Sequence, residues 1–162
     1  MRLWHYKLLP YLPELQFKGQ LRELVAIMHN WRDKGKTNHL LINRVMEYDK
    51  VHLTSYFLRY RQQYQIRCGK DIDTKLVIEF LQFSDYQHGI DFKIDPIAGK
   101  FVSVRLKTDI FPGWHTKEYL RMNMSNLAEK HIYGIGKSRI TDEEWQVLLD
   151  GYKAITGEGY VV

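Results

Sequence analysis

Glu23 is the residue whose sequence surroundings most suggest chemistry. It stands in a segment, residues 14–30, whose apolar positions fall mostly at helical spacing. Two small residues, Gly19 and Ala26, lie about one turn away on the same helix face. A glycine inside a helix costs about 1 kcal/mol relative to alanine, which suggests that something approaches this carboxylate closely. Such a carboxylate can stabilise developing positive charge or transfer a proton. Close helix–helix packing, with Glu23 in an ordinary surface ion pair, is the alternative that composition alone favours.

Other arrangements of reactive residues are missing from the sequence. The histidines are scattered, without a His-x-x-x-His pair, and Cys68 is the one cysteine, so no zinc or calcium pattern is present. The run Gly134–Ser138 resembles a phosphate-binding loop, but that loop needs a glycine where this chain has His131. A flexible basic loop is the favoured interpretation. The sequence therefore predicts no metal site and no bound cofactor.

The sequence also predicts a cytoplasmic protein. Cys68 has no second cysteine with which to form an internal disulfide, which favours a reducing setting. No segment approaches the roughly 20 apolar residues of a membrane span. The first residues lack the apolar core of a signal peptide. We therefore expect no membrane partner, and the sequence leaves the oligomeric state open.

Charge is distributed unevenly along the chain. The 24 basic and 19 acidic residues give a net charge of +5. Residues 1–70 hold 13 basic and 5 acidic residues, a net charge of +8, whereas residues 71–162 hold 11 and 14, a net charge of −3. The positive half is a candidate contact surface for a polyanion such as a nucleic acid. A solvated basic face without a partner is the alternative.

The predicted fold class is mainly α: a helical bundle-like single domain with a small β-hairpin in the second half. Apolar spacing and turn residues mark the elements. One stripe of the third helix is expected in the core: Leu53, Tyr56, Phe57, Tyr60 and Tyr64. The expected helices cover residues 14–30, a segment from 37 or 38, then 49–67, 73–83, 116–131 and 141–156, and the hairpin covers residues 91–106.

Local patterns mark the ends of two of these helices. Thr141 with Glu144 three residues later is a capping box, which predicts the start of the last helix. Thr37, or the asparagine after it, can cap the second helix. That helix is expected to carry Leu41 and Val45 into the core.

Several short motifs resemble the pyrimidine-dimer DNA glycosylase (endonuclease V) family, in particular its bacterial members. They occur in the family's order and near the same chain positions. The resemblance covers about residues 1–70, which it implies are a basic, helical glycosylase core, with residues 71–162 as an extension packed on it. The motifs are Met1-Arg2-Leu3-Trp4, Tyr11-Leu12-Pro13, Leu21-Arg22-Glu23-Leu24, Gly35-Lys36 and the aromatic, basic stretch Val51–Lys70.

The resemblance implies a DNA-repair glycosylase and abasic-site lyase that acts on double-stranded DNA with a damaged base, without metal or cofactor. Met1 would supply the α-amine that attacks the sugar C1′, and Glu23 would assist elimination of the 3′ phosphate. Arg2 and Arg22 would contact phosphates or base edges, and Lys36 the DNA backbone. An α-amine has an ordinary pKa of about 7.7–8.0, so a useful fraction is nucleophilic near neutral pH.

Trp4 and His5 lie beside the proposed amine and are further candidates for DNA contact. Trp4 is favoured as a core anchor over a base-stacking wedge, and His5 as a structural hydrogen-bonding group over a proton shuttle. The chain departs from phage-type members in two ways. Arg2 is too large for ordinary methionine removal, so Met1 is expected to carry the amine. Ala26 stands where those proteins have another arginine, which puts specificity for dimers in doubt.

Two other functions remain open at this point. The first is a nucleic-acid-binding protein on the same scaffold without catalysis. The second is a different DNA- or RNA-directed activity, with the acidic second half binding a partner protein. For a repair enzyme, cyclobutane dimers, oxidised bases and abasic sites are all substrates that the sequence allows.

Overall fold

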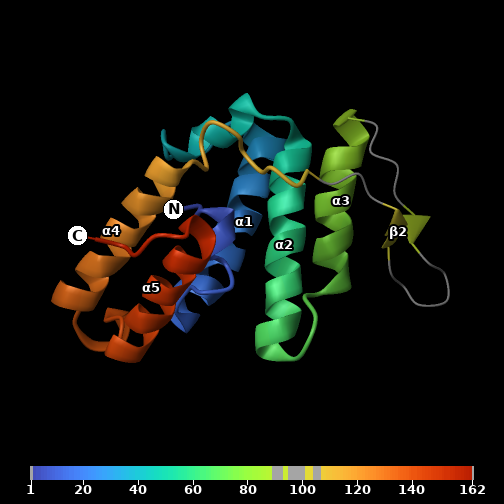
Figure 1. Ribbon diagram of the computed structural model, residues 1–162. Helices are drawn as coiled ribbons and strands as arrows, with labels where there is room; N and C mark the ends of the chain where they lie inside the picture. Colours follow the sequence, from blue (N-terminus) through green and yellow to red (C-terminus); the bar gives the residue numbers. More distant parts are fainter. Residues whose placement is uncertain (1, 89–92, 95–100, 104–106, 162) are drawn as a thin grey trace. The chain divides into compact units, whose positions relative to one another are not determined.

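Helices form most of the described chain (Figure 1), which confirms the mainly helical fold class. The structure is a computed structural model that describes residues 2–88, 93–94, 101–103 and 107–161. Its contacts divide the chain into two compact units. The terminal unit comprises residues 2–23 and 112–162, and the central unit comprises residues 24–111. Helix α1 (Glu14–Lys34) contributes its first part to the terminal unit and the remainder to the central unit.

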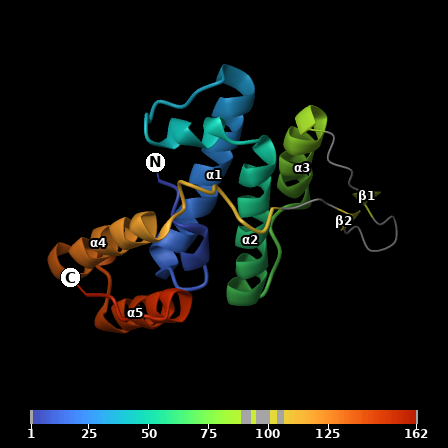
Figure 2. The same ribbon diagram turned by 45° about the horizontal axis from the view of Figure 1, so that its top comes forward.

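The terminal unit combines residues from the first and the last parts of the described chain. Helices α4 (Lys117–Tyr133) and α5 (Asp142–Thr156) lie side by side in both views (Figure 1, Figure 2). Thr116 caps α4, and Thr141 with Glu144 forms the predicted capping box of α5. The unit also holds the first part of α1 and two short 3-10 helices, η1 (Tyr6–Leu8) and η3 (Gly136–Ser138).

Gly151 allows α5 to approach the ring of Tyr11. A Cβ atom placed at Gly151 would lie 2.3 Å from Cγ of Tyr11, far inside van der Waals contact. Tyr11 follows η1, which packs on α5. The cost of a glycine inside this helix is therefore offset by close packing that any larger residue would prevent.

The central unit is built on α2 (Lys50–Cys68) and α3 (Thr74–His88), which run side by side (Figure 1, Figure 2). Asp49 caps α2 by accepting a hydrogen bond from the Val51 amide. The rings of Phe57 and Phe80 stack with their centroids 3.9 Å apart. The predicted core stripe is confirmed in four of its positions, because Leu53, Tyr56, Phe57 and Tyr60 are fully buried, whereas Tyr64 is half-buried.

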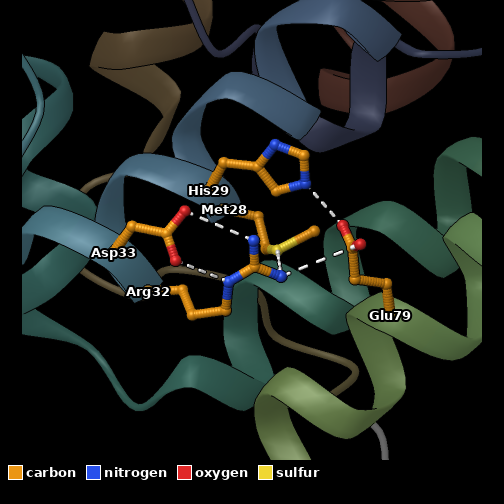
Figure 3. A network of polar contacts seen from close by, with 5 residues as sticks. All are labelled: Met28, His29, Arg32, Asp33 and Glu79. Atoms are coloured by element: carbon orange, nitrogen blue, oxygen red, sulfur yellow. Dashed lines mark hydrogen bonds and ion pairs between the residues drawn. The ribbon is translucent and has the colours of Figure 1, made fainter.

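A polar network joins the second part of α1 to α3 (Figure 3). Glu79 of α3 contacts Nε2 of His29 at 2.5 Å and Nη1 of Arg32 at 3.7 Å. Arg32 also donates to Asp33 at 2.9 Å. Because these side chains are partly exposed, each pair contributes little to the stability of the fold. The network therefore orients the two helices more than it stabilises them.

The segment after α1 is not the α-helix that the sequence predicts. It forms the 3-10 helix η2 (Ile42–Glu47), and Leu41 is 83% exposed, so its inward placement was wrong, although Val45 is buried as expected. Oδ1 of Asn43 accepts hydrogen bonds from both the amide and the hydroxyl group of Thr37, at 2.7 and 2.8 Å. Such side-chain bonds offer the backbone an alternative to a regular helix.

Most of the hairpin predicted over residues 91–106 lies outside the described residues. Within that range the structure describes β1 (Lys93–Ile94) and β2 (Phe101–Ser103), which pair antiparallel with an irregular register. These short segments do not confirm the predicted hairpin. The division into a core of residues 1–70 and an extension of residues 71–162 also stays a prediction.

Replacing Gly151 with alanine is expected to destabilise the protein by about 1–3 kcal/mol, because the added methyl group would clash with the Tyr11 ring. The matched control is Gly19→Ala in α1, where a Cβ atom meets nothing within 4 Å. That change should stabilise the protein by about 0.5–1 kcal/mol. Urea unfolding measures both effects, and a Gly151→Ala protein as stable as the wild type would contradict the close contact.

Candidate functional site

The carboxylate of Glu23 accepts a hydrogen bond from the beginning of the chain. The backbone N–H of Arg2 donates to Oε2 of Glu23 at 2.8 Å. Gln20, one turn earlier on α1, donates to the carbonyl oxygen of Arg2 at 2.9 Å and to Oε2 of Glu23 at 3.5 Å. The Gln20 side chain also accepts the N–H of Trp4 at 2.9 Å. Residues 2–4 are thus held along one face of α1.

The described residues enclose the Glu23 carboxylate only in part. The residue is half-buried, and among the described residues only its Oε2 atom is hydrogen-bonded. The position of a Cβ atom at Gly19 is also open, with nothing within 4 Å. Close helix packing therefore does not account for this glycine, and the partner of Glu23 is a backbone amide rather than a surface cation. Both observations favour the interpretation in which a ligand approaches this face.

Two arginines are linked to Glu23 by the chain. The guanidinium carbon of Arg2, whose amide bonds Glu23, lies 4.7 Å from the ring centroid of Trp4, a cation–π contact. Trp4 is 4% exposed, which favours the core-anchor interpretation over base stacking. Arg22 is exposed on α1, next in the chain to Glu23.

His5 is a buried hydrogen-bonding group. Its Nε2–H donates to the carbonyl oxygen of His115 at 2.9 Å, and its Nδ1 accepts the N–H of Lys7 at 3.1 Å. These two bonds require the neutral ring with its proton on Nε2. Burial lowers the pKa of His5 from 6.5 to about 4. The structural interpretation of His5 is therefore favoured over a proton shuttle at neutral pH.

The sequence predicts two further site residues, Met1 and Lys36. Met1 lies outside the described residues. Lys36 is exposed in the loop after α1 and belongs to the central unit. The functional roles of both stay predictions.

The sequence did not single out the residues that hold this site together. Gln20 directly precedes the Leu21–Leu24 motif, but only its burial in the fold distinguishes it. The hydroxyl group of Tyr119, 116 residues further along the chain, donates to the carbonyl oxygen of Leu3 at 2.5 Å. Oδ1 of Asn123 accepts the N–H of His5 at 2.7 Å. Hydrogen bonds between such distant residues leave no periodic trace in a sequence, so no local signal could have found them.

Within the described part of the chain, no group of three or more histidine, cysteine or carboxylate side chains is arranged to hold a metal ion. No helix in the same residues is long and apolar enough to cross a bilayer.

An acid on a helix, held against the start of a basic chain, is an arrangement suited to a DNA-repair glycosylase. Residues 1–74 match the family described as pyrimidine dimer DNA glycosylase, which confirms the family that the sequence motifs indicate. The description of that family names pyrimidine dimers in DNA as what its members act on. Residues 75–162 lie outside it. Searches of curated proteins and of solved structures gave no match.

The burial of a neutral His5 is expected to make stability depend on pH. An unfolded histidine binds a proton below about pH 6.5, whereas folded His5 binds one only near pH 4. Between these values the unfolded state holds more protons, so the free energy of unfolding rises with pH. The contribution is fully present above about pH 6.5, where it reaches about 3 kcal/mol, and is lost as the pH falls toward 4.

Urea unfolding at about pH 7 and about pH 4.5 measures this contribution. The His5→Gln protein should lose less stability on acidification than the wild type. His39→Gln, which changes an exposed histidine, is the matched control and should behave as the wild type does. An identical pH dependence of all three proteins would show that His5 is not protonated on unfolding in this range.

Proposed function

We propose that this protein is a DNA glycosylase and abasic-site lyase that removes damaged pyrimidines from double-stranded DNA. The α-amine of Met1 acts as the nucleophile, and the Glu23 carboxylate assists. The observation that carries the proposal is the 2.8 Å hydrogen bond from the Arg2 amide to Glu23. It ties the acid of the helix motif to the residue that follows the proposed nucleophile.

Covalent geometry limits how far this nucleophile is from the acid. Consecutive backbone nitrogens are at most about 3.6 Å apart. The Met1 nitrogen is therefore within one residue's reach of an amide that already contacts Glu23. A carboxylate at that range can act on the same sugar as the amine.

The proposed reaction has three covalent steps. The neutral amine of Met1 attacks C1′, the glycosidic C1′–N bond breaks, and its electron pair leaves with the base, which takes up the proton that the amine loses. The C1′–O4′ bond then breaks, O4′ keeps its electron pair and takes up a proton, and the nitrogen lone pair forms the C1′=N bond of a protonated imine. This imine makes the C2′ hydrogen acidic. Glu23 accepts that proton, and the C3′–O bond breaks with its electron pair leaving on the 3′ phosphate. Oε1 of Glu23, to which no described residue donates a hydrogen bond, is the oxygen proposed for this transfer.

Recognition of the DNA would rest on positive charge and on the weak pairing of damaged bases. Arg2 and Arg22 are proposed to contact phosphates or base edges, and Lys36 the DNA backbone. A damaged pair stacks poorly, so moving its nucleotide out of the duplex costs less than for an intact pair. The open face at Gly19 provides space for the sugar.

Borohydride trapping tests the imine. Incubation with abasic or ultraviolet-damaged duplex, followed by reduction, should give a covalent protein–DNA adduct that maps to the N-terminal peptide. Glu23→Gln should lower the rate of strand cleavage by about 100-fold or more, because the general base is lost. Glu14→Gln, which changes an exposed carboxylate of the same helix, should cleave at the wild-type rate.

Two outcomes would remove parts of this proposal. If the wild-type protein binds both duplexes but forms no adduct, the non-catalytic nucleic-acid-binding function is favoured instead. A protein that carries an uncleaved N-terminal extension, confirmed by intact mass, should be inactive because its α-amine is displaced. Full activity of that extended protein would exclude Met1 as the nucleophile.

Filling the open face of α1 is expected to obstruct the DNA. Gly19→Leu should leave the free energy of unfolding unchanged or higher, since leucine is a good helix former and the space is empty. It should lower kcat/KM on damaged duplex at least about tenfold, with Gly19→Ala intermediate. A Gly19→Leu enzyme with wild-type kcat/KM would show that the substrate does not approach this face.

A further inference from the structure

The segment that begins the chain is held on a second side by residues far along the sequence. Its backbone makes three hydrogen bonds to side chains of residues 115–123, in the terminal unit. The His5 amide donates to Asn123 at 2.7 Å, the Tyr6 amide donates to Nδ1 of His115 at 3.1 Å, and the Leu3 carbonyl oxygen accepts from Tyr119 at 2.5 Å.

These side chains come from one end of α4 and the residues before it. Tyr119 and Asn123 are four residues apart, so they share a face of the helix. Asn123 is 1% exposed and His115 is 7% exposed. Thr116, which lies between His115 and Tyr119 in the chain, caps α4 and so fixes where the helix begins.

These contacts matter because the backbone groups that they satisfy are buried away from water. Leu3, Trp4 and His5 are buried and belong to no helix or strand in the described structure. A buried amide or carbonyl group without a partner costs about 1–3 kcal/mol. The segment therefore stays in place only while α1 and α4 both supply partners, Gln20 and Glu23 from one side, Tyr119 and Asn123 from the other.

We propose that Tyr119 and Asn123 are positioning residues for the reaction. They act through the backbone of residues 3–5 and set where the chain start lies relative to the Glu23 carboxylate. The inference rests on the proposed function. It assigns the region beyond residue 74, which the family match does not cover, a part in the active site.

The test compares single-turnover strand cleavage with binding of an abasic duplex. Asn123→Ala and Tyr119→Phe should each lower the cleavage rate of folded enzyme by roughly 10- to 100-fold, because a displacement of about 1 Å can have that effect. The dissociation constant of the duplex should change by less than about threefold. Asn123→Asp, which keeps an acceptor oxygen for the His5 amide, should recover most of the rate.

Matched substitutions on the same helix control for effects on folding. Tyr133→Phe removes the same hydroxyl group from an exposed tyrosine of α4, and Asn126→Ala truncates a half-buried asparagine one turn from Asn123. Both should cleave at the wild-type rate. Thermal unfolding of every variant gives the folded fraction to which the rates are normalised.

Amide hydrogen exchange gives a readout that does not depend on activity. The His5 amide should exchange on the order of ten times faster in Asn123→Ala than in the wild type, and not in Asn126→Ala. If the wild-type protein forms no borohydride adduct, the proposed function fails. If it forms the adduct but Asn123→Ala and Tyr119→Phe cleave as fast per folded molecule as the wild type, the positioning role alone is overturned.

Discussion

The candidate site depends on one hydrogen bond, from the amide of Arg2 to the carboxylate of Glu23. The backbone near the chain start is extended and has no neighbouring strand in the described structure, so its polar groups must find partners among side chains. A bond to an ionised acceptor is stronger than one between neutral groups. The Gln20 side chain makes two further hydrogen bonds to the same segment, accepting from the Trp4 amide and donating to the Arg2 carbonyl oxygen. The acid and the beginning of the chain therefore cannot move independently.

The terminal unit shows why both ends of the sequence are needed to build this arrangement. Side chains of α1 satisfy one edge of residues 2–5, and side chains of α4 satisfy the other. His5 adds a condition on protonation, because its two hydrogen bonds exist only with a neutral ring. The family match ends at residue 74, whereas Tyr119 and Asn123, which bond the backbone of residues 3 and 5, lie outside it.

Gly19 and Gly151, both inside helices, show which properties of a residue can be predicted from the sequence and which cannot. Both carry the same intrinsic cost, and the sequence suggests for Gly19 that something must come close. Gly151 is the one that packs closely, against Tyr11, whereas the space beside Gly19 is empty and lies on the face of Glu23. Of two identical residues in similar helices, one is thus packed against a ring and the other has free space beside it, and only the neighbouring atoms distinguish them.

The sequence by itself determined most of the helices and the family resemblance of residues 1–74. Helix starts such as the Thr141 capping box, and the helix that carries Glu23, follow from side chains within a few residues of one another. The prediction of an α-helix from residue 37 or 38 was wrong, because hydrogen bonds between Thr37 and the Asn43 side chain compete with the helical backbone pattern. The link from Asn123 to His5 was decided only by the tertiary structure. A hydrogen bond across 118 residues depends on how helices pack, and packing leaves no spacing along the chain from which it could be inferred.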